Sequence, residues 1–160
     1  ELAGTYSNAS DYPQMAKMAL KEMVRQVKTA QFEIISGEKS GQITGELSVD
    51  VDYADSGLER MLRGVIVRHL VLPGHVEESK KVIRYLYETY GDQIYISIMN
   101  QYTPMPEIEI HYPELGRKIT QQEYDEVVDY AIDIGVENGF IQEGETAEKS
   151  FIPEFDITGI

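Results

Sequence analysis

Polar residues that are able to hold a ligand follow three apolar runs of the chain. In parallel α/β sheets, ligands bind at the carboxyl ends of the strands. If the three runs are parallel strands, the polar groups meet at one edge of a sheet and form a candidate binding site. The same residues also suit an ordinary transition from strand to loop, so both explanations stay open. The groups are Pro73, Gly74 and His75; Asn100, Gln101 and Tyr102; and Gln142 with Glu143.

Arg68 and His69 stand inside the first apolar run, VIVRHLVL. A guanidinium in such a run needs a partner, which is either an acidic side chain or a ligand carboxylate or phosphate. Successive side chains of a strand face opposite sides, so only one of the two residues points to the inner face of the sheet. For His69, a place in the core or in an interface is the ordinary alternative.

Metal and thiol chemistry has little support in this sequence. The chain has no cysteine, which excludes disulfides, thiolate catalysis and thiolate-bound metals or clusters on this chain alone. Its three histidines lack the spacing of a metal site. Asp50, Asp52 and Asp55 resemble a calcium loop only loosely, and a solvated acidic surface is the alternative. No metal site is therefore predicted.

The composition is that of one soluble domain, predicted to cover residues 1–160. The net charge of -14, from 14 basic and 28 acidic residues, disfavours binding to nucleic acid or to anionic membranes. No apolar run approaches the roughly 18 residues of a membrane span, and the first residues do not resemble a signal peptide. We therefore expect a cytoplasmic protein.

Hydrophobic periodicity predicts an α/β chain with parallel strands. A capping box, Thr120 to Glu123, opens the last helix. The first helix is expected to be capped by Asp11 and to bury its methionines, including Met15 and Met23. The predicted order is a loop over 1–10, a helix over 12–29, a hairpin within 30–62, a strand over 65–72, a helix over 76–90, a strand over 94–99, a loop over 103–119, a helix over 120–135 and a strand over 138–142.

Two local features are predicted more finely. In the hairpin, Gln31–Ile35 pairs with about Gln42–Tyr53 across a glycine-containing turn, and residues 57–62 form one helical turn. The strand over 65–72 is nearly continuous in apolar residues, which predicts burial on both of its faces.

Several separated segments resemble, in order, the later part of radical SAM enzymes. They are LKEMVRQV, VRHLVLPGH, YISIMNQYTP, ITQQEYDEVVDYAIDIGVENGFIQEGE and SFIPEFD. The closest group is the proteins related to pyruvate formate-lyase-activating enzyme. The resemblance implies the C-terminal portion of a partial (β/α) TIM-like barrel, with residues 30–62 as an inserted β-hairpin. That insertion is either a partner-binding element or a decorative loop.

The resemblance also implies a set of binding residues for S-adenosylmethionine (SAM). Arg68 matches an arginine that lies near the polar part of SAM. Leu70 matches an apolar residue that contacts the adenine, and Tyr102 matches a residue that packs on the adenine. Asn100 and Gln101 are neighbours of that site. Gln142 and Glu143 are placed on the substrate side.

The family uses a CxxxCxxC motif to hold a [4Fe–4S] cluster, and that motif is absent here. The resemblance therefore implies an iron-sulfur oxidoreductase in which this segment supplies part of the SAM pocket, a missing N-terminal half supplies the cluster, and the segment alone is inactive. Its expected partner is a glycyl-radical enzyme or another protein substrate.

The alternative to the enzyme is a stand-alone α/β binding module with a degenerate site. Because an isolated half-barrel exposes a sheet edge, a homodimer through that edge is expected.

Overall fold

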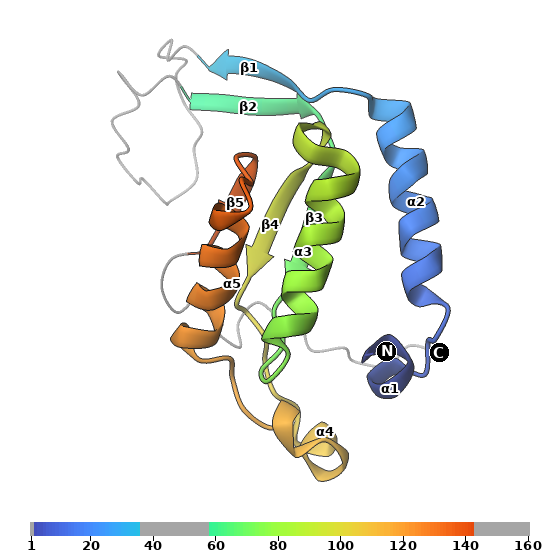
Figure 1. Ribbon diagram of the computed structural model, residues 1–160, viewed down its shortest axis with the longest axis vertical. Helices are drawn as coiled ribbons and strands as arrows, with labels where there is room; N and C mark the ends of the chain where they lie inside the picture. The colour runs from blue at the N-terminus through green and yellow to red at the C-terminus, as the bar shows by residue number, and fades with distance from the viewer. Residues whose placement is uncertain (1, 36–57, 143–160) are drawn as a thin grey trace, which may run out of the picture. The chain divides into compact units, whose positions relative to one another are not determined.

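The computed structural model describes residues 2–35 and 58–142, which fall into two compact units, Glu1–Val65 and Ile66–Ile160. The first contains two helices and an antiparallel strand pair, and the second contains a three-stranded parallel sheet with helices (Figure 1). The predicted α/β class with parallel strands is thus confirmed. The described strands form no closed barrel, and the assignment of residues 1–160 to one domain stays a prediction.

The first unit begins with two helices, α1 (Leu2–Ser7) and α2 (Tyr12–Val27). The prediction of a loop over the first ten residues was therefore wrong. Asp11 precedes α2 as expected, but its side chain makes no capping hydrogen bond, and Pro13 occupies the first turn. Proline suits that position because its missing N–H has no acceptor within the helix.

The methionines of α2 do not form a core. Met15 is 57% exposed and Met23 is 49% exposed, whereas Leu20 and Val24 are buried. The helix carries two apolar stripes, and a 3.6-residue period does not say which of them is covered. Burying a methionine also costs more rotamer entropy than burying a leucine.

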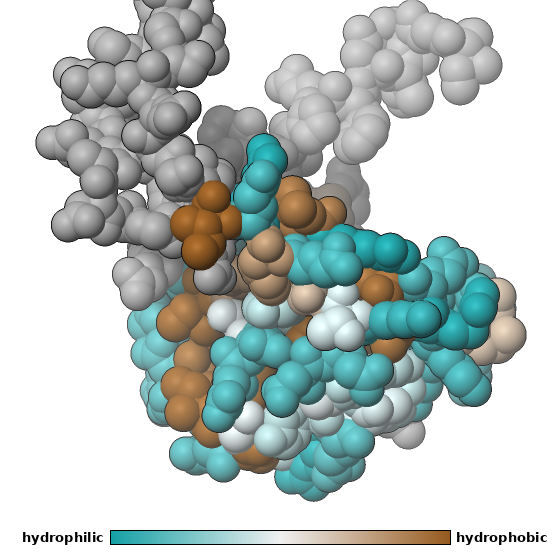
Figure 2. All heavy atoms as spheres, turned by 90° about the horizontal axis from the view of Figure 1, so that it is seen from above, coloured by the Kyte–Doolittle hydropathy of each residue, from teal (hydrophilic) through white to brown (hydrophobic). Residues whose placement is uncertain are grey.

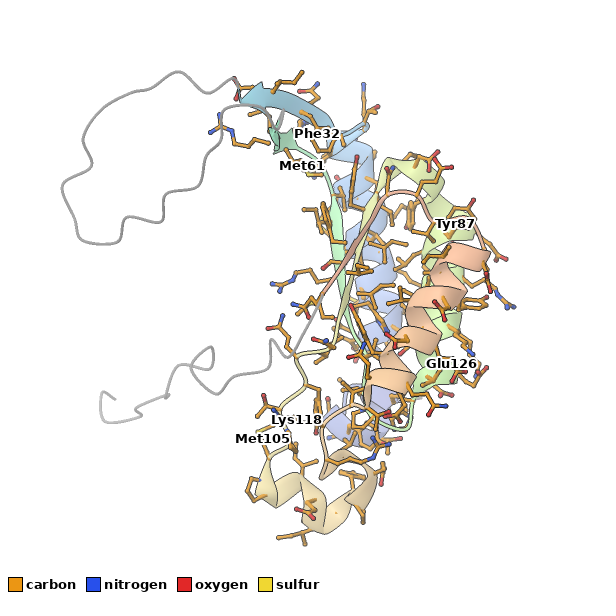
Figure 3. The ribbon with its side chains drawn as sticks, turned by 90° about the vertical axis from the view of Figure 1, so that its left-hand side faces the viewer. Phe32, Met61, Tyr87, Met105, Lys118 and Glu126 are labelled. Carbon is orange, nitrogen blue, oxygen red and sulfur yellow. The ribbon has the colours of Figure 1, made fainter. Side chains whose placement is uncertain are left out.

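The antiparallel pair consists of β1 (Gln31–Ile35) and β2 (Leu58–Arg63). Phe32 lies opposite Met61 in this register, as Figure 3 shows. A hairpin that starts at Gln31–Ile35 was predicted, and β1 does pair antiparallel with a later strand, but that strand is Leu58–Arg63, so the predicted pairing was wrong. The helical turn predicted over 57–62 was also wrong, since cross-strand pairing holds an extended backbone there. The second strand predicted at Gln42–Tyr53 lies outside the described residues.

The second unit is a βαβ unit extended by one more strand. Strands β3 (Ile66–Leu70), β4 (Tyr95–Met99) and β5 (Gly139–Ile141) are parallel and lie in sequence order. Helix α3 (Val76–Tyr90) connects the first two, and α5 (Gln121–Asp133) precedes the third. Right-handed crossovers between strands in this order place both helices on the same face of the sheet.

Helices α3 and α5 lie side by side over that face (Figure 1). Their buried residues and those of β4 form the core of the unit. Val82 and Ile132 are apolar residues of these helices but are 40% and 64% exposed, since they lie at the margins of the helix stripes. The core comprises Ile83, Leu86, Tyr90, Ile94, Ile96, Ile98, Tyr124, Val127, Val128 and Ala131.

No described helix of the second unit covers the other face of its parallel sheet, which we call the open face. Ile66 and Leu70 of β3 are 46% and 37% exposed, and Phe140 of β5 is 45% exposed. The prediction that the strand over 65–72 is buried on both faces was therefore wrong, because the described helices of this unit cover only one side. Seen from above, apolar residues reach the surface between hydrophilic ones (Figure 2).

Short helical segments connect these elements. A single turn, Gly91–Gln93, follows α3, where Gly91 has φ +49°. The segment predicted as a loop over 103–119 contains α4 (Pro106–His111) and one further turn, Pro113–Leu115. Proline is common in loops, but it is also favoured in the first turn of a helix, where it stands in both of these segments.

Candidate functional site

The carboxyl end of β3 turns sharply at Pro73 and Gly74. Pro73 is fully buried, and Gly74 adopts φ +79°, a left-handed conformation that glycine tolerates. The amide of His75 donates to the carbonyl oxygen of Leu72 at 3.1 Å and closes the turn. The amide of Gly74 donates to Oε1 of Glu123 on α5 at 2.8 Å. The turn after β3 is therefore tied to the amino end of α5.

Glu123 is the centre of a hydrogen-bond network at this turn. Arg117 donates to its two carboxylate oxygens through Nη1 and Nη2, each at 2.7 Å. The amide and the hydroxyl of Thr120 donate to Oε2 at 3.0 and 2.9 Å, and the Glu123 amide donates back to the hydroxyl. The capping box predicted from the sequence is thus confirmed. The Arg117 guanidinium is the main cause that holds the pKa of Glu123 well below its usual range, so this carboxyl group is charged at neutral pH.

The ends of β4 and β5 meet in a second group of polar residues. Gln142 Oε1 accepts a hydrogen bond from the Asn100 amide at 3.0 Å. The Gln142 amide donates to the Tyr124 hydroxyl at 2.7 Å, and this hydroxyl donates to the Ile98 carbonyl oxygen at 2.9 Å. We call Tyr124, Gln142, Asn100 and the Ile98 carbonyl the strand-end cluster. Two of the predicted site residues, Asn100 and Gln142, are therefore brought into direct contact.

No site role was predicted for Tyr124. Its side chain is almost fully buried, and burial raises the pKa of the Tyr124 phenol, so the hydroxyl retains the proton that it donates. Glu123 was predicted only as part of a capping box. Nothing in the spacing of the sequence indicates that either residue reaches a strand end, because both contacts depend on how α5 packs over the sheet.

Arg68 lies on the open face of the sheet. In the register of the ladder it is opposite Ser97, which is in turn opposite Phe140. Leu70 follows two residues later on the same face, at the carboxyl end of β3. The ring of Phe140 stacks on that of Tyr95, with 5.6 Å between their centroids. Arg68 is therefore an exposed cation with Ser97 beside it in the ladder and with Ile66 and Leu70 on the same face of its own strand.

Tyr102 is placed differently from the other predicted site residues. It is 8% exposed, and its hydroxyl donates to the Leu115 carbonyl oxygen at 2.9 Å. In this structure the ring is part of the packing beneath the loop after β4. The prediction that it packs on an adenine stays a prediction. Gln101, beside it, is half-buried, and Glu143 lies outside the described residues.

His69 faces the covered side of the sheet, opposite Ile98 in the ladder. Its Nε2 is buried and has no hydrogen-bond partner among the described residues. Burial lowers the pKa of His69 to about 4, so the imidazole is neutral at neutral pH. Of the two adjacent polar residues of β3, Arg68 is thus the one on the face away from the helices.

Helices α3 and α5 are joined on their outer side by charged and aromatic contacts. Lys80 donates to Glu77 and to Glu126 at 2.9 and 2.6 Å, and Glu126 is labelled on α5 in Figure 3. Arg84 donates through Nε to the Tyr130 hydroxyl at 2.5 Å and lies over that ring. These contacts join α3 to α5 and hold the helix pair together.

Metal binding finds no support in the part of the chain that the structure describes. No group of three or more histidine, aspartate or glutamate residues able to hold an ion occurs there. The acidic residues Asp50, Asp52 and Asp55 lie outside that part. No described helix is long and apolar enough to cross a membrane.

Comparison of the chain with protein-family models, with curated proteins and with solved structures finds no match. The candidate site is therefore interpreted from its own geometry and from the resemblance of its sequence segments.

Proposed function

We propose that this chain is the C-terminal part of a radical SAM enzyme related to pyruvate formate-lyase-activating enzyme. In this proposal, Arg68, Leu70 and the residues after β4 line part of the SAM pocket, and the whole enzyme generates a glycyl radical on a partner protein. The cluster and SAM together supply the reductive cleavage that starts such a reaction. The chain's own residues bind and orient.

The observation that carries this proposal is the way in which the parallel sheet is wound. Strands β3, β4 and β5 follow one another in sequence order, and both helices cover the same face. A doubly wound sheet reverses its strand order and has helices on both faces, whereas a (β/α) barrel continues in one direction with helices only outside. The open face then corresponds to the interior of a barrel, and it carries Arg68 and Leu70.

The residues present suit part of SAM. An exposed guanidinium beside apolar side chains matches a ligand with a carboxylate at one end and an aromatic base at the other. Asn100 and Gln142 add polar groups at the strand ends. Tyr102 contributes less surface, because its ring is buried and its hydroxyl is engaged.

The residues present do not suit the [4Fe–4S] cluster. The chain contains no cysteine, and cluster irons in this class of enzyme need thiolate ligands. In the proposal these ligands come from residues outside the printed sequence. A reading frame without CxxxCxxC upstream of Glu1, and without a partner chain that carries one, would contradict it.

The experiment measures SAM binding and cleavage by the protein extended to its upstream residues, after anaerobic reconstitution with iron and sulfide. The wild type is expected to release 5′-deoxyadenosine on reduction. Arg68→Ala is expected to weaken SAM binding by about 1–3 kcal/mol, the scale of a lost charge-assisted hydrogen bond.

Lys81→Ala is the matched control, because it also removes one cation but from an exposed position on α3. Equal SAM affinity in the Arg68 and Lys81 variants would show that Arg68 does not contact SAM. A wild-type protein that neither binds nor cleaves SAM would refute the enzyme.

A stand-alone binding module is the second candidate, and the exposed apolar side chains on the open face favour it. This candidate predicts that the chain binds its ligand stably in the absence of iron and SAM. Calorimetry of the chain with SAM and with inorganic phosphate separates the two, since a module that uses Arg68 for a simple anion binds phosphate equally well.

A further inference from the structure

The Tyr124 hydroxyl occupies an unusual place between two parallel strands. Ile96 donates to the Asn138 carbonyl oxygen at 2.9 Å, and Ile98 is opposite Ile141. In a parallel ladder of this register, the Gln142 amide is the next group to donate to Ile98. Here the Tyr124 hydroxyl lies between these two groups. It accepts a hydrogen bond from the Gln142 amide and donates one to the Ile98 carbonyl oxygen.

The Tyr124 hydroxyl thus holds the backbone of Gln142, and the Asn100 amide sets the orientation of the Gln142 carboxamide. The side chain of Gln142 returns to the end of β4, where its Oε1 accepts the Asn100 amide. A backbone N–H only donates, so the oxygen of the carboxamide must face it and the NH₂ group must face the other way. The strand-end cluster thus presents hydrogen-bond donors at the edge where parallel sheets bind their ligands.

We propose that Tyr124 is a positioning residue that holds Gln142 so that its NH₂ group binds an oxygen acceptor of the substrate, namely a peptide carbonyl beside the reacting glycine. This inference rests on the proposed function. Beyond that function, it names the peptide carbonyl oxygen as the substrate atom that is bound, and Tyr124 of α5 as the residue that positions Gln142. Tyr124 itself need not touch the substrate.

Gln142→Glu tests the recognition directly. A glutamate still accepts the Asn100 amide but replaces the NH₂ donors by an acceptor, which repels a carbonyl oxygen. The probe is the blocked peptide acetyl-Ala-Gly-Ala-amide, and the measurement is the peptide dependence of 5′-deoxyadenosine release by the reconstituted enzyme. The KM for the peptide is expected to rise by about ten-fold or more, the scale of one hydrogen bond. An unchanged KM would overturn the assignment.

Tyr124→Phe tests the positioning, with Tyr130→Phe as its matched control. Both variants remove one hydroxyl from α5, but Tyr130 contacts Arg84 on the outer side of the helices. Tyr124→Phe is expected to raise the KM and to speed hydrogen exchange of the Asn100 amide by about ten-fold, because the Gln142 side chain is no longer held against it.

Tyr130→Phe is expected to change neither the KM nor the exchange at Asn100. Equal exchange at Asn100 in both variants would overturn the positioning role even if Tyr124→Phe lowers stability. A wild type that fails to cleave SAM would instead overturn the proposed function and with it the peptide assignment. The exchange at Asn100 would still decide the role of Tyr124.

Discussion

Two side chains of the second unit have lowered pKa values for opposite physical reasons. His69 is deprived of water, which favours its neutral form, whereas Glu123 is held by Arg117 and by backbone amides, which favour its charged form. In both cases the unfolded chain binds protons more readily than the folded chain. Both residues therefore make the fold less stable as the pH falls.

For His69, the loss occurs between the unfolded pKa of about 6.5 and the folded pKa of about 4. Stability is complete above this window and declines within it, by about 2 kcal/mol between pH 7 and pH 5. His69→Leu is expected to remove that part of the decline. Denaturant unfolding at the two pH values measures it, and the exposed His111→Leu serves as control. A decline as steep in His69→Leu as in the wild type would contradict the assignment.

For Glu123, removal of the charge disrupts a network that also fixes the turn at Gly74. Glu123→Gln is expected to lower the free energy of unfolding by about 1–3 kcal/mol at neutral pH. The difference from the wild type should shrink as the pH falls below the ordinary glutamate range, because the unfolded wild-type chain then takes up a proton that the folded carboxyl group still resists. Chemical unfolding against Glu137→Gln, an exposed glutamate, measures the effect, and equal losses would argue against the network.

At the scale of elements, the sequence predicts those whose signals are local. Helix α3 begins and ends at the predicted residues because Gly91 supplies a left-handed end. Helix α5 begins at its capping box for the same kind of reason. The partner strand of β1 was not predictable, since pairing joins residues far apart in the chain. Helix α4 was missed because proline occurs both in loops and in the first turn of a helix.

The capping box of α5 gives a prediction for a single element. Thr120→Ala is expected to lower stability by about 1 kcal/mol, the usual cost of losing an N-cap. Thr120→Ser keeps the hydroxyl and is therefore expected to retain most of the stability that Thr120→Ala loses. Thermal unfolding of the two variants measures the effect, and if serine and alanine proved equally destabilising, the Thr120 hydroxyl would not be the stabilising group.

At the scale of the whole chain, the open face and the edge strand β5 are expected to cause self-association. Exposed apolar residues and unpaired strand edges favour contact with a second copy. Phe140→Lys is expected to shift the chain toward the monomer in analytical ultracentrifugation. Ile110→Lys on α4 adds the same charge at another exposed apolar position and is expected to leave association unchanged. A monomeric wild type would refute the expectation.

The candidate site divides in the same way between what is local and what is not. Asn100 and Gln142 were predicted because polar residues at strand ends are visible in the sequence, Arg68 because a guanidinium inside an apolar run needs a partner, and Leu70 only through the family resemblance. The contact of Asn100 with Gln142 through a glutamine oxygen was not predictable, and neither was the hydroxyl of Tyr124 between two strands.

By itself, the sequence determined the α/β class, both ends of α3, the start of α5 and the residues that follow each parallel strand, because these depend on side-chain period, caps and turns a few residues apart. Only the tertiary structure decided which face of the sheet stays open, which stripe of α2 is buried and which residue of α5 reaches the strand ends. These features depend on packing between segments distant in the chain, and the free energies that select among alternative packings are sums of many small contacts.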